Sequence, residues 1–126
     1  MNSKDLASQL TQVSVSAIAA RTSTVTSSAV DLRGYKGGLV IEQLVGVVSG
    51  TSPTLDGKLQ ESADGSTGWT DISDATFTQV TATDSFQKIG IDVRQTRGYV
   101  RYVGTIAGTT PSFTMGVVLN GIKERN

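Results

Sequence analysis

Apolar and polar residues alternate with a period of two along most of this chain, and turn-forming clusters interrupt the alternation roughly every ten residues. Such alternation turns one face of a strand toward a core and the other toward solvent. The pattern begins at Val13, where valines and Ala17 alternate with serines, and the most apolar segment, residues 39–48, is predicted to be a central strand. Further strands are expected over residues 22–32, 54–61, 69–72, 77–81, 86–93, 99–107 and 112–119.

This spacing of short strands predicts an all-β fold, a single antiparallel β-sandwich of jelly-roll type with about eight strands. Clusters of glycine, proline, serine and aspartate separate the strands because these residues favour turns. They predict chain reversals at Gly37-Gly38, at residues 49–53 and 108–111, and at Asp64-Gly65.

The first residues do not share the alternation. Leu6, Leu10 and Val13 have the i, i+4, i+7 spacing of a short amphipathic helical turn, and a frayed arm is the alternative. We therefore divide the chain into an N-terminal arm, residues 1–12, and a β-sandwich domain, residues 13–126. A sandwich fills its core from its strands, so the arm leucines are expected to contact a neighbouring subunit or partner. The alternative is that they pack on their own domain.

Composition excludes several kinds of chemistry. The 126-residue chain, long enough for one domain, contains neither cysteine nor histidine. Disulfides and cysteine nucleophiles are therefore excluded, and the commonest general base and metal ligand is missing. We predict no enzymatic activity, no catalytic residue, no cofactor and no metal site. A formal net charge of +0 argues against a nucleic-acid partner. No apolar run approaches the ~20 residues that span a bilayer, so no membrane partner is expected, and the first residues do not resemble a secretion signal.

The segment ESADGSTGWTDI, residues 61–72, raises three possibilities. Ser62, Asp64 and the glycines form a hairpin loop by themselves, which is the favoured interpretation. The only tryptophan, Trp69, also permits a sugar contact, although carbohydrate modules usually present several aromatic platforms. Calcium binding would need six to eight oxygens, and the local carboxylates do not establish that number.

The segment RQTRGYVRY, residues 94–102, interleaves arginines with tyrosines. Such a pattern occurs in single-stranded nucleic-acid sites. Here it covers only one turn and one strand. We therefore favour pairing of the arginines with carboxylates across strands, or stacking of arginine on tyrosine.

Two stretches resemble a known class of proteins. TLDGKLQESADGSTGWTDI contains an E-S-x-D-G hairpin, and FQKIGIDVRQTRGYVRYVGTIAGTTPSFTMGVVLNGIK contains a strand ending near V-R, a YVRYV strand and a closing VVLNG strand. The pattern covers roughly residues 39–122 and is similar to small virion proteins of tailed bacteriophages. Those are β-sandwich or jelly-roll proteins that decorate or cement the head.

The resemblance implies a structural virion protein, most specifically a capsid decoration or cement protein. Its partner would be the major capsid protein, and it would lie on the capsid surface after synthesis in the host cytoplasm. Because multivalency strengthens attachment to adjacent sites, we expect a homo-oligomer, either dimer or trimer. The predicted contact residues are Leu6, Leu10 and Trp69. The alternatives are a carbohydrate-binding β-sandwich module or another virion component, such as a head-completion or tail protein.

Overall fold

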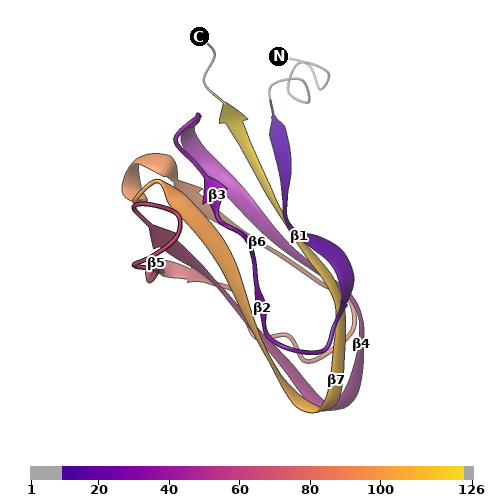
Figure 1. Cartoon of the computed structure of the whole chain (residues 1–126). Helices are drawn as coiled ribbons and strands as arrows, with labels where there is room; N and C mark the ends of the chain where they lie inside the picture. Colours follow the sequence, from indigo (N-terminus) through magenta and orange to yellow (C-terminus); the bar gives the residue numbers. More distant parts are fainter. Residues whose placement is uncertain (1–9, 124–126) are drawn as a thin grey trace, which may run out of the picture.

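The computed structural model describes residues 10–123, and in that range one 3-10 helix accompanies seven β-strands (Figure 1). The all-β class predicted from the alternation is therefore confirmed. The strands are β1 (Thr11–Arg21), β2 (Val25–Thr26), β3 (Val30–Asp31), β4 (Tyr35–Ser62), β5 (Thr70–Thr76), β6 (Ser85–Asp92) and β7 (Tyr99–Lys123). The 3-10 helix η1 spans Val93–Gln95. Val13, which the sequence also allowed in a helical turn, belongs to β1.

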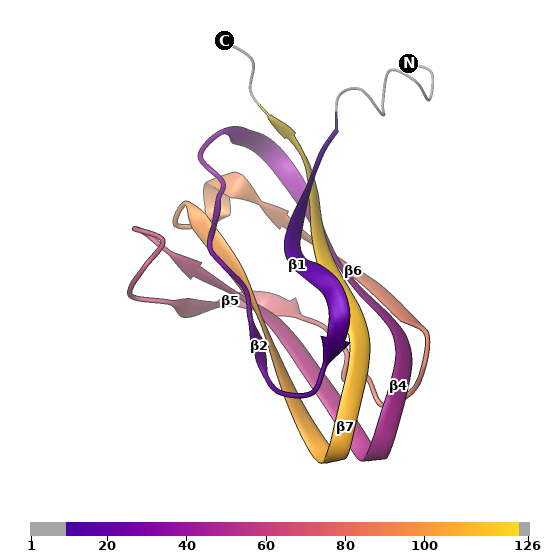
Figure 2. The same cartoon turned by 45° about the vertical axis from the view of Figure 1, so that its right-hand side comes forward.

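All strands pair antiparallel in one sheet in which β7 and β4 are central neighbours. Both long strands bend, so the sheet folds over itself as a sandwich (Figures 1 and 2). The β6 layer consists of β1, the second half of β7, the first half of β4, and β6. The β5 layer consists of β2 and β3, the first half of β7, the second half of β4, and β5. This arrangement fits the predicted sandwich of jelly-roll type.

The bend lies where β4 and β7 each carry a Gly-Thr-Ser/Thr-Pro sequence, and Thr51 pairs with Thr109 at its centre. Gly50 and Gly108 have φ values of +109° and +121°, which favour glycine. A Cβ on Gly50 would lie 2.6 Å from the carbonyl oxygen of Thr110. The chain reverses direction here as predicted (Figure 1), but the predicted breaks between strands were wrong: because β4 and β7 stay paired through the bend, four predicted strands merge into two.

Two other local predictions were also wrong. Residues 77–81 form no strand: Val80 makes an isolated bridge with Leu55, and the backbone N–H of Phe77 donates to the carbonyl of Gly57. Phe77 and Val80 are nevertheless buried, which explains their apolar character. Gly37-Gly38 lies inside β4 rather than at a reversal, because β4 pairs with β7 on either side of it, with a register shift between Lys36 and Val40, and pairs with β6 from Gly38 onward.

The core between the layers contains one polar pair. Gln43 of the β6 layer and Tyr102 of the β5 layer are both fully buried, and the Tyr102 hydroxyl donates to Gln43 Oε1 at 2.5 Å. The paired glycines Gly57 and Gly104 make room for it, because a Cβ on either would meet the Tyr102 hydroxyl at 2.6–2.7 Å. Burial also raises the pKa of Tyr102 far above its usual value. The remaining core is apolar.

Candidate interaction surface

The outer face of the β6 layer exposes large apolar side chains. Along β4, Leu39, Ile41 and Val45 point into the core, so Val40 and Leu44 point outward. Phe86 of β6 and Ile18 of β1 are each 71% exposed, and Val47 is 64% exposed. The other large hydrophobic residues exposed in the described range are Leu10 and Val40, which belong to the same layer. The apolar exposure is therefore confined to one side of the sandwich.

Several of these residues form a row across the four strands of the layer. Leu44 pairs with Phe86 on one side and with Gly116 on the other. Ile18 lies against Gly116 so closely that a Cβ there would be 2.5 Å from Ile18 Cγ1. The row therefore runs from Ile18 across Gly116 and Leu44 to Phe86. We call this outer surface of the β6 layer the apolar face.

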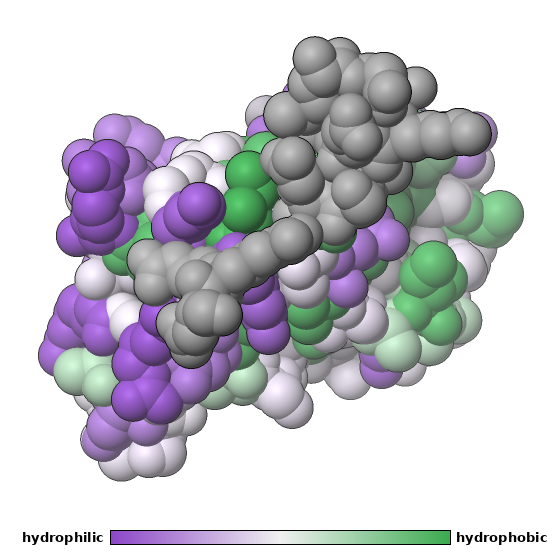
Figure 3. Space-filling view, turned by 90° about the horizontal axis from the view of Figure 1, so that it is seen from above, coloured by the Kyte–Doolittle hydropathy of each residue, from purple (hydrophilic) through white to green (hydrophobic). Residues whose placement is uncertain are grey.

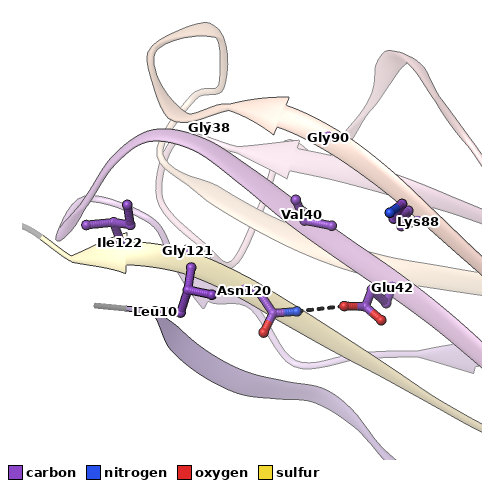
Figure 4. Close-up of a pocket in the computed structure, with 9 residues that line it drawn as sticks. All are labelled: Leu10, Gly38, Val40, Glu42, Lys88, Gly90, Asn120, Gly121 and Ile122. Atoms are coloured by element: carbon purple, nitrogen blue, oxygen red, sulfur yellow. Dashed lines mark hydrogen bonds between the residues drawn. The ribbon is translucent and has the colours of Figure 1, made fainter. Parts of the chain in front are cut away.

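A shallow groove of about 660 Å³ lies on the same face, near the end of the sheet where the described chain begins (Figure 4). Its apolar walls are Leu10, Val40 and Ile122, and Gly38 and Gly90 form part of its floor. Glu42 and Lys88 line one end of it, and Asn120 donates a hydrogen bond to Glu42 at 2.9 Å. The lining is completed by Gly121.

The outer face of the β5 layer is polar, and its side chains bond to one another. Arg101 donates to Gln60 at 2.9 Å, and Gln60 donates to Asp71 at 2.9 Å. Lys58 forms an ion pair with Asp71 at 3.1 Å, and hydrogen bonds from Gln60 and Lys58 lower the pKa of that carboxyl. Seen from above, hydrophilic residues gather on the β5 side of the molecule and hydrophobic residues on the opposite side (Figure 3). We call the outer surface of the β5 layer the polar face.

The predicted contact residues do not lie together. Leu10 lines the groove on the apolar face. Trp69, just before β5, is half-buried, and the Arg101 guanidinium lies 4.5 Å from its ring centroid. Leu6 falls outside the described residues.

The loop between β4 and β5 is held by its own hydrogen bonds, as the favoured interpretation of its sequence required. Asp64 accepts from the backbone N–H groups of Ser66 and Thr67 at 2.9 and 2.8 Å, and these bonds hold the pKa of its carboxyl well below the usual range. The buried Ser62 hydroxyl accepts from the N–H of Gly65 at 3.1 Å. The loop therefore needs no ligand to keep its shape.

The interpretation that we favoured for the basic segment 94–102 is not borne out in detail, because within the described residues none of its arginines forms an ion pair across strands or stacks on a tyrosine. Arg94 pairs with Asp92 at 3.0 Å, and Arg97 Nη1 donates to the carbonyl of Gly68 at 3.2 Å. Arg101 stacks on Trp69, as described above. Arg94 is thus paired locally, whereas Arg97 and Arg101 contact the loop before β5 and, at Gln60, the neighbouring strand.

Reasoning from the sequence missed the apolar face. The signal was present in residues 39–48, where apolar residues occupy both alternating positions of one strand. Apolar side chains on both faces of a strand need to be buried, and the core buries those on only one face. Within residues 10–123, acidic side chains form no cluster suited to a metal ion, and no helix has the length and apolar character to cross a membrane.

Comparisons with known proteins identify the fold. No family model and no curated protein matches the chain. Among solved structures, 93% of the chain superimposes on a chain in the structure of infectious bursal disease virus, Gx strain, with a TM-score of 0.61 and 16% identity. The match spans 32% of that viral chain. A weaker likeness, with a TM-score of 0.48 and 14% identity, covers 89% of this chain and 95% of the SPBc2 prophage-derived protein YomS. The chain thus shares its sandwich fold with part of a much longer chain in a virus structure.

Proposed function

We propose that this protein is a structural component of a virion, and specifically a capsid decoration or cement protein of a tailed bacteriophage. It binds the major capsid protein at the capsid surface and stabilises the head. The observation that carries the proposal is the unequal character of the two outer faces. One is apolar and unpartnered within the described residues, whereas the side chains of the other bond to one another.

The apolar face is the proposed contact with the shell. Soluble monomers rarely expose large contiguous apolar patches, and such patches usually mark protein or membrane contacts. Burying a side chain the size of Phe86 or Ile18 contributes about 1.5–3 kcal/mol. The fold shared with a chain in a virus structure supports the viral class of function, although it does not identify the partner.

Self-association is part of the proposal. A dimer or trimer would bind adjacent sites of a shell more tightly than a monomer, because the second contact becomes intramolecular. Leu6 and Leu10 are the proposed contacts between subunits. Trp69 remains a proposed contact through the part of its ring that Arg101 leaves open.

Other functions receive less support from the surface. A carbohydrate module would use Trp69 as a stacking platform, but Arg101 covers one face of this ring. A head-completion or tail protein would have the same fold and a similar apolar contact. The position of the protein in the particle distinguishes these roles from decoration.

Co-sedimentation with capsid shells, assembled from the major capsid protein of the virus that encodes the chain, tests the proposal. Phe86→Ser and Ile18→Ser should each weaken binding by about 30-fold, which corresponds to about 2 kcal/mol of lost apolar burial. Thr105→Ala, at an exposed position of the β5 layer, is the control and should bind like the unmodified protein. Failure to co-sediment, together with tight retention on a glycan array, would reverse the assignment.

A further inference from the structure

The groove on the apolar face contains two glycines within strands that packing of the core does not require. Gly38 and Gly90 lie on its floor, within β4 and β6. Neither has positive φ, and a Cβ on either would meet only a carbonyl oxygen, at 3.8–3.9 Å. Glycine weakens the interior of a strand and often marks a place where another backbone approaches closely. The two glycines therefore indicate an occupant that needs space above bare backbone.

The described chain begins at the edge of this groove. Leu10 is one of its walls and precedes β1, so residues 1–9 are joined to the domain at this groove. Their sequence, MNSKDLASQ, contains apolar Leu6 and the adjacent charges Lys4 and Asp5. In an extended segment Lys4 and Leu6 would share a face with Leu10, because side chains alternate.

The charges in the groove match such a segment. Glu42 and Lys88 lie opposite each other on neighbouring strands, and neither belongs to an ion pair among the described residues. With Lys4 and Leu6 facing the sheet, Lys4 would pair with Glu42 while Leu6 covers Val40. Nine extended residues reach about 30 Å, and β7 and β6 are only about 10 Å apart, so the segment is long enough to cross the groove.

We infer that the groove over Gly38 and Gly90 binds residues 1–9 of a second copy of this chain. A segment entering its own groove would have to reverse immediately before Leu10. Ala7, Ser8 and Gln9 include neither the glycine nor the proline that favours such a reversal. The assignment deepens the proposed function: it rests on the proposed self-association and names the segment and groove that carry it.

Cysteine cross-linking tests the assignment directly, because the full chain contains no cysteine of its own. Leu6→Cys and Gly90→Cys proteins of different mass are mixed and oxidised, and Gly46→Cys replaces Gly90→Cys as the control. Gly46 lies farther along β4 and likewise has space for a Cβ, 3.6 Å from the carbonyl oxygen of Thr114. We expect a disulfide between Leu6→Cys and Gly90→Cys chains, in clear excess over the disulfide formed with Gly46→Cys.

A second measurement uses a filled groove. Gly90→Val should weaken self-association in sedimentation velocity by about ten-fold or more, which corresponds to about 1.4 kcal/mol. Gly46→Val should leave self-association unchanged. Equal cross-linking to both cysteine positions, or unaltered self-association of Gly90→Val, would overturn the assignment. It would also be overturned by an unmodified protein that stays monomeric, or by a Leu6→Cys, Gly90→Cys double variant that cross-links only within one chain. A monomeric protein would also remove self-association from the proposed function, whereas binding to the capsid is judged separately by co-sedimentation.

Discussion

Replacement of Tyr102 by phenylalanine tests the polar pair at the centre of the sandwich. The hydroxyl is the hydrogen-bond donor to Gln43 Oε1, and the Nε2 atom of this amide has no partner in the described structure. Removing the hydroxyl therefore leaves both polar atoms of a fully buried amide without a protein partner. A buried group left unpaired costs about 1–3 kcal/mol, so we expect Tyr102→Phe to lower the free energy of unfolding by about 2 kcal/mol. For a domain of this size, Tm should fall by about 8 °C.

A double-mutant cycle separates this loss from general damage to the packing. Gln43→Met nearly preserves volume but leaves the tyrosine hydroxyl without its acceptor, so it should cost a similar amount. The double variant has no polar group left to desolvate. It should therefore be clearly more stable than the sum of the single losses predicts, with a coupling of about 1–2 kcal/mol.

The assay is equilibrium unfolding in urea, followed by the fluorescence of the only tryptophan and by circular dichroism. Gly104→Ala serves as a positive control, because its Cβ would meet the Tyr102 hydroxyl at 2.7 Å. If the effects of Gln43→Met and Tyr102→Phe simply add, or if Tyr102→Phe is as stable as the unmodified protein, the pair does not act as a unit and the reasoning is refuted.

Three further predictions concern pH, the bend and the tryptophan. Burial raises the pKa of Tyr102 in the folded state, so the tyrosine loses its proton at a lower pH in the unfolded state, and the free energy of unfolding should fall as pH rises above about 10. In urea unfolding measured across this pH range, Tyr102→Phe should reduce that fall. An equal dependence of stability on pH in both proteins would refute the role of Tyr102. Gly108→Ala places a Cβ 2.8 Å from the carbonyl oxygen of Ser52 at a φ of +121° and should lower the free energy of unfolding by at least about 2 kcal/mol. Gly34→Ala, whose Cβ meets nothing within 4 Å, should lower it by less than about 0.5 kcal/mol. Equal destabilisation by the two variants would contradict the account of the bend. If Trp69 is a contact, its emission should shift to the blue on assembly, and an unchanged spectrum would remove it from the interface.

Much of the fold was predictable from local patterns. The period of two located β1, β6 and the separate halves of β4 and β7 correctly. The loop at Asp64 was predictable because its hydrogen bonds come from its own residues. Local sequence could not show that β4 and β7 continue through the bend. A Gly-Thr-Ser-Pro segment serves equally well as a loop between two strands or as a bend within one strand, and the outcome depends on pairing between Thr51 and Thr109, far apart in sequence.

The candidate surface was harder to predict for a related reason. Periodicity shows that Val40 and Leu44 lie on the opposite side of β4 from Leu39 and Ile41, but not which side faces the core. The apolar run of residues 39–48 predicted a central strand but not what covers each of its faces. In the structure the core buries only one face of this strand. The alternation of residues does not show whether a partner buries the other face. Phe86 was less ambiguous, because the alternation places it on the same side of its strand as Lys88 and opposite Ile89.

Hydroxyl-radical footprinting tests most directly whether the apolar face is the contact surface. Phe86 is 71% exposed on that face, whereas Tyr99 belongs to the β5 layer and lies beneath the Arg33 guanidinium at 5.1 Å. Both rings react with hydroxyl radicals, so each protein preparation contains its own reference. On capsid-bound protein we predict that oxidation of Phe86 falls several-fold relative to free protein while oxidation of Tyr99 stays constant. Undiminished oxidation of Phe86 on bound protein would contradict the account.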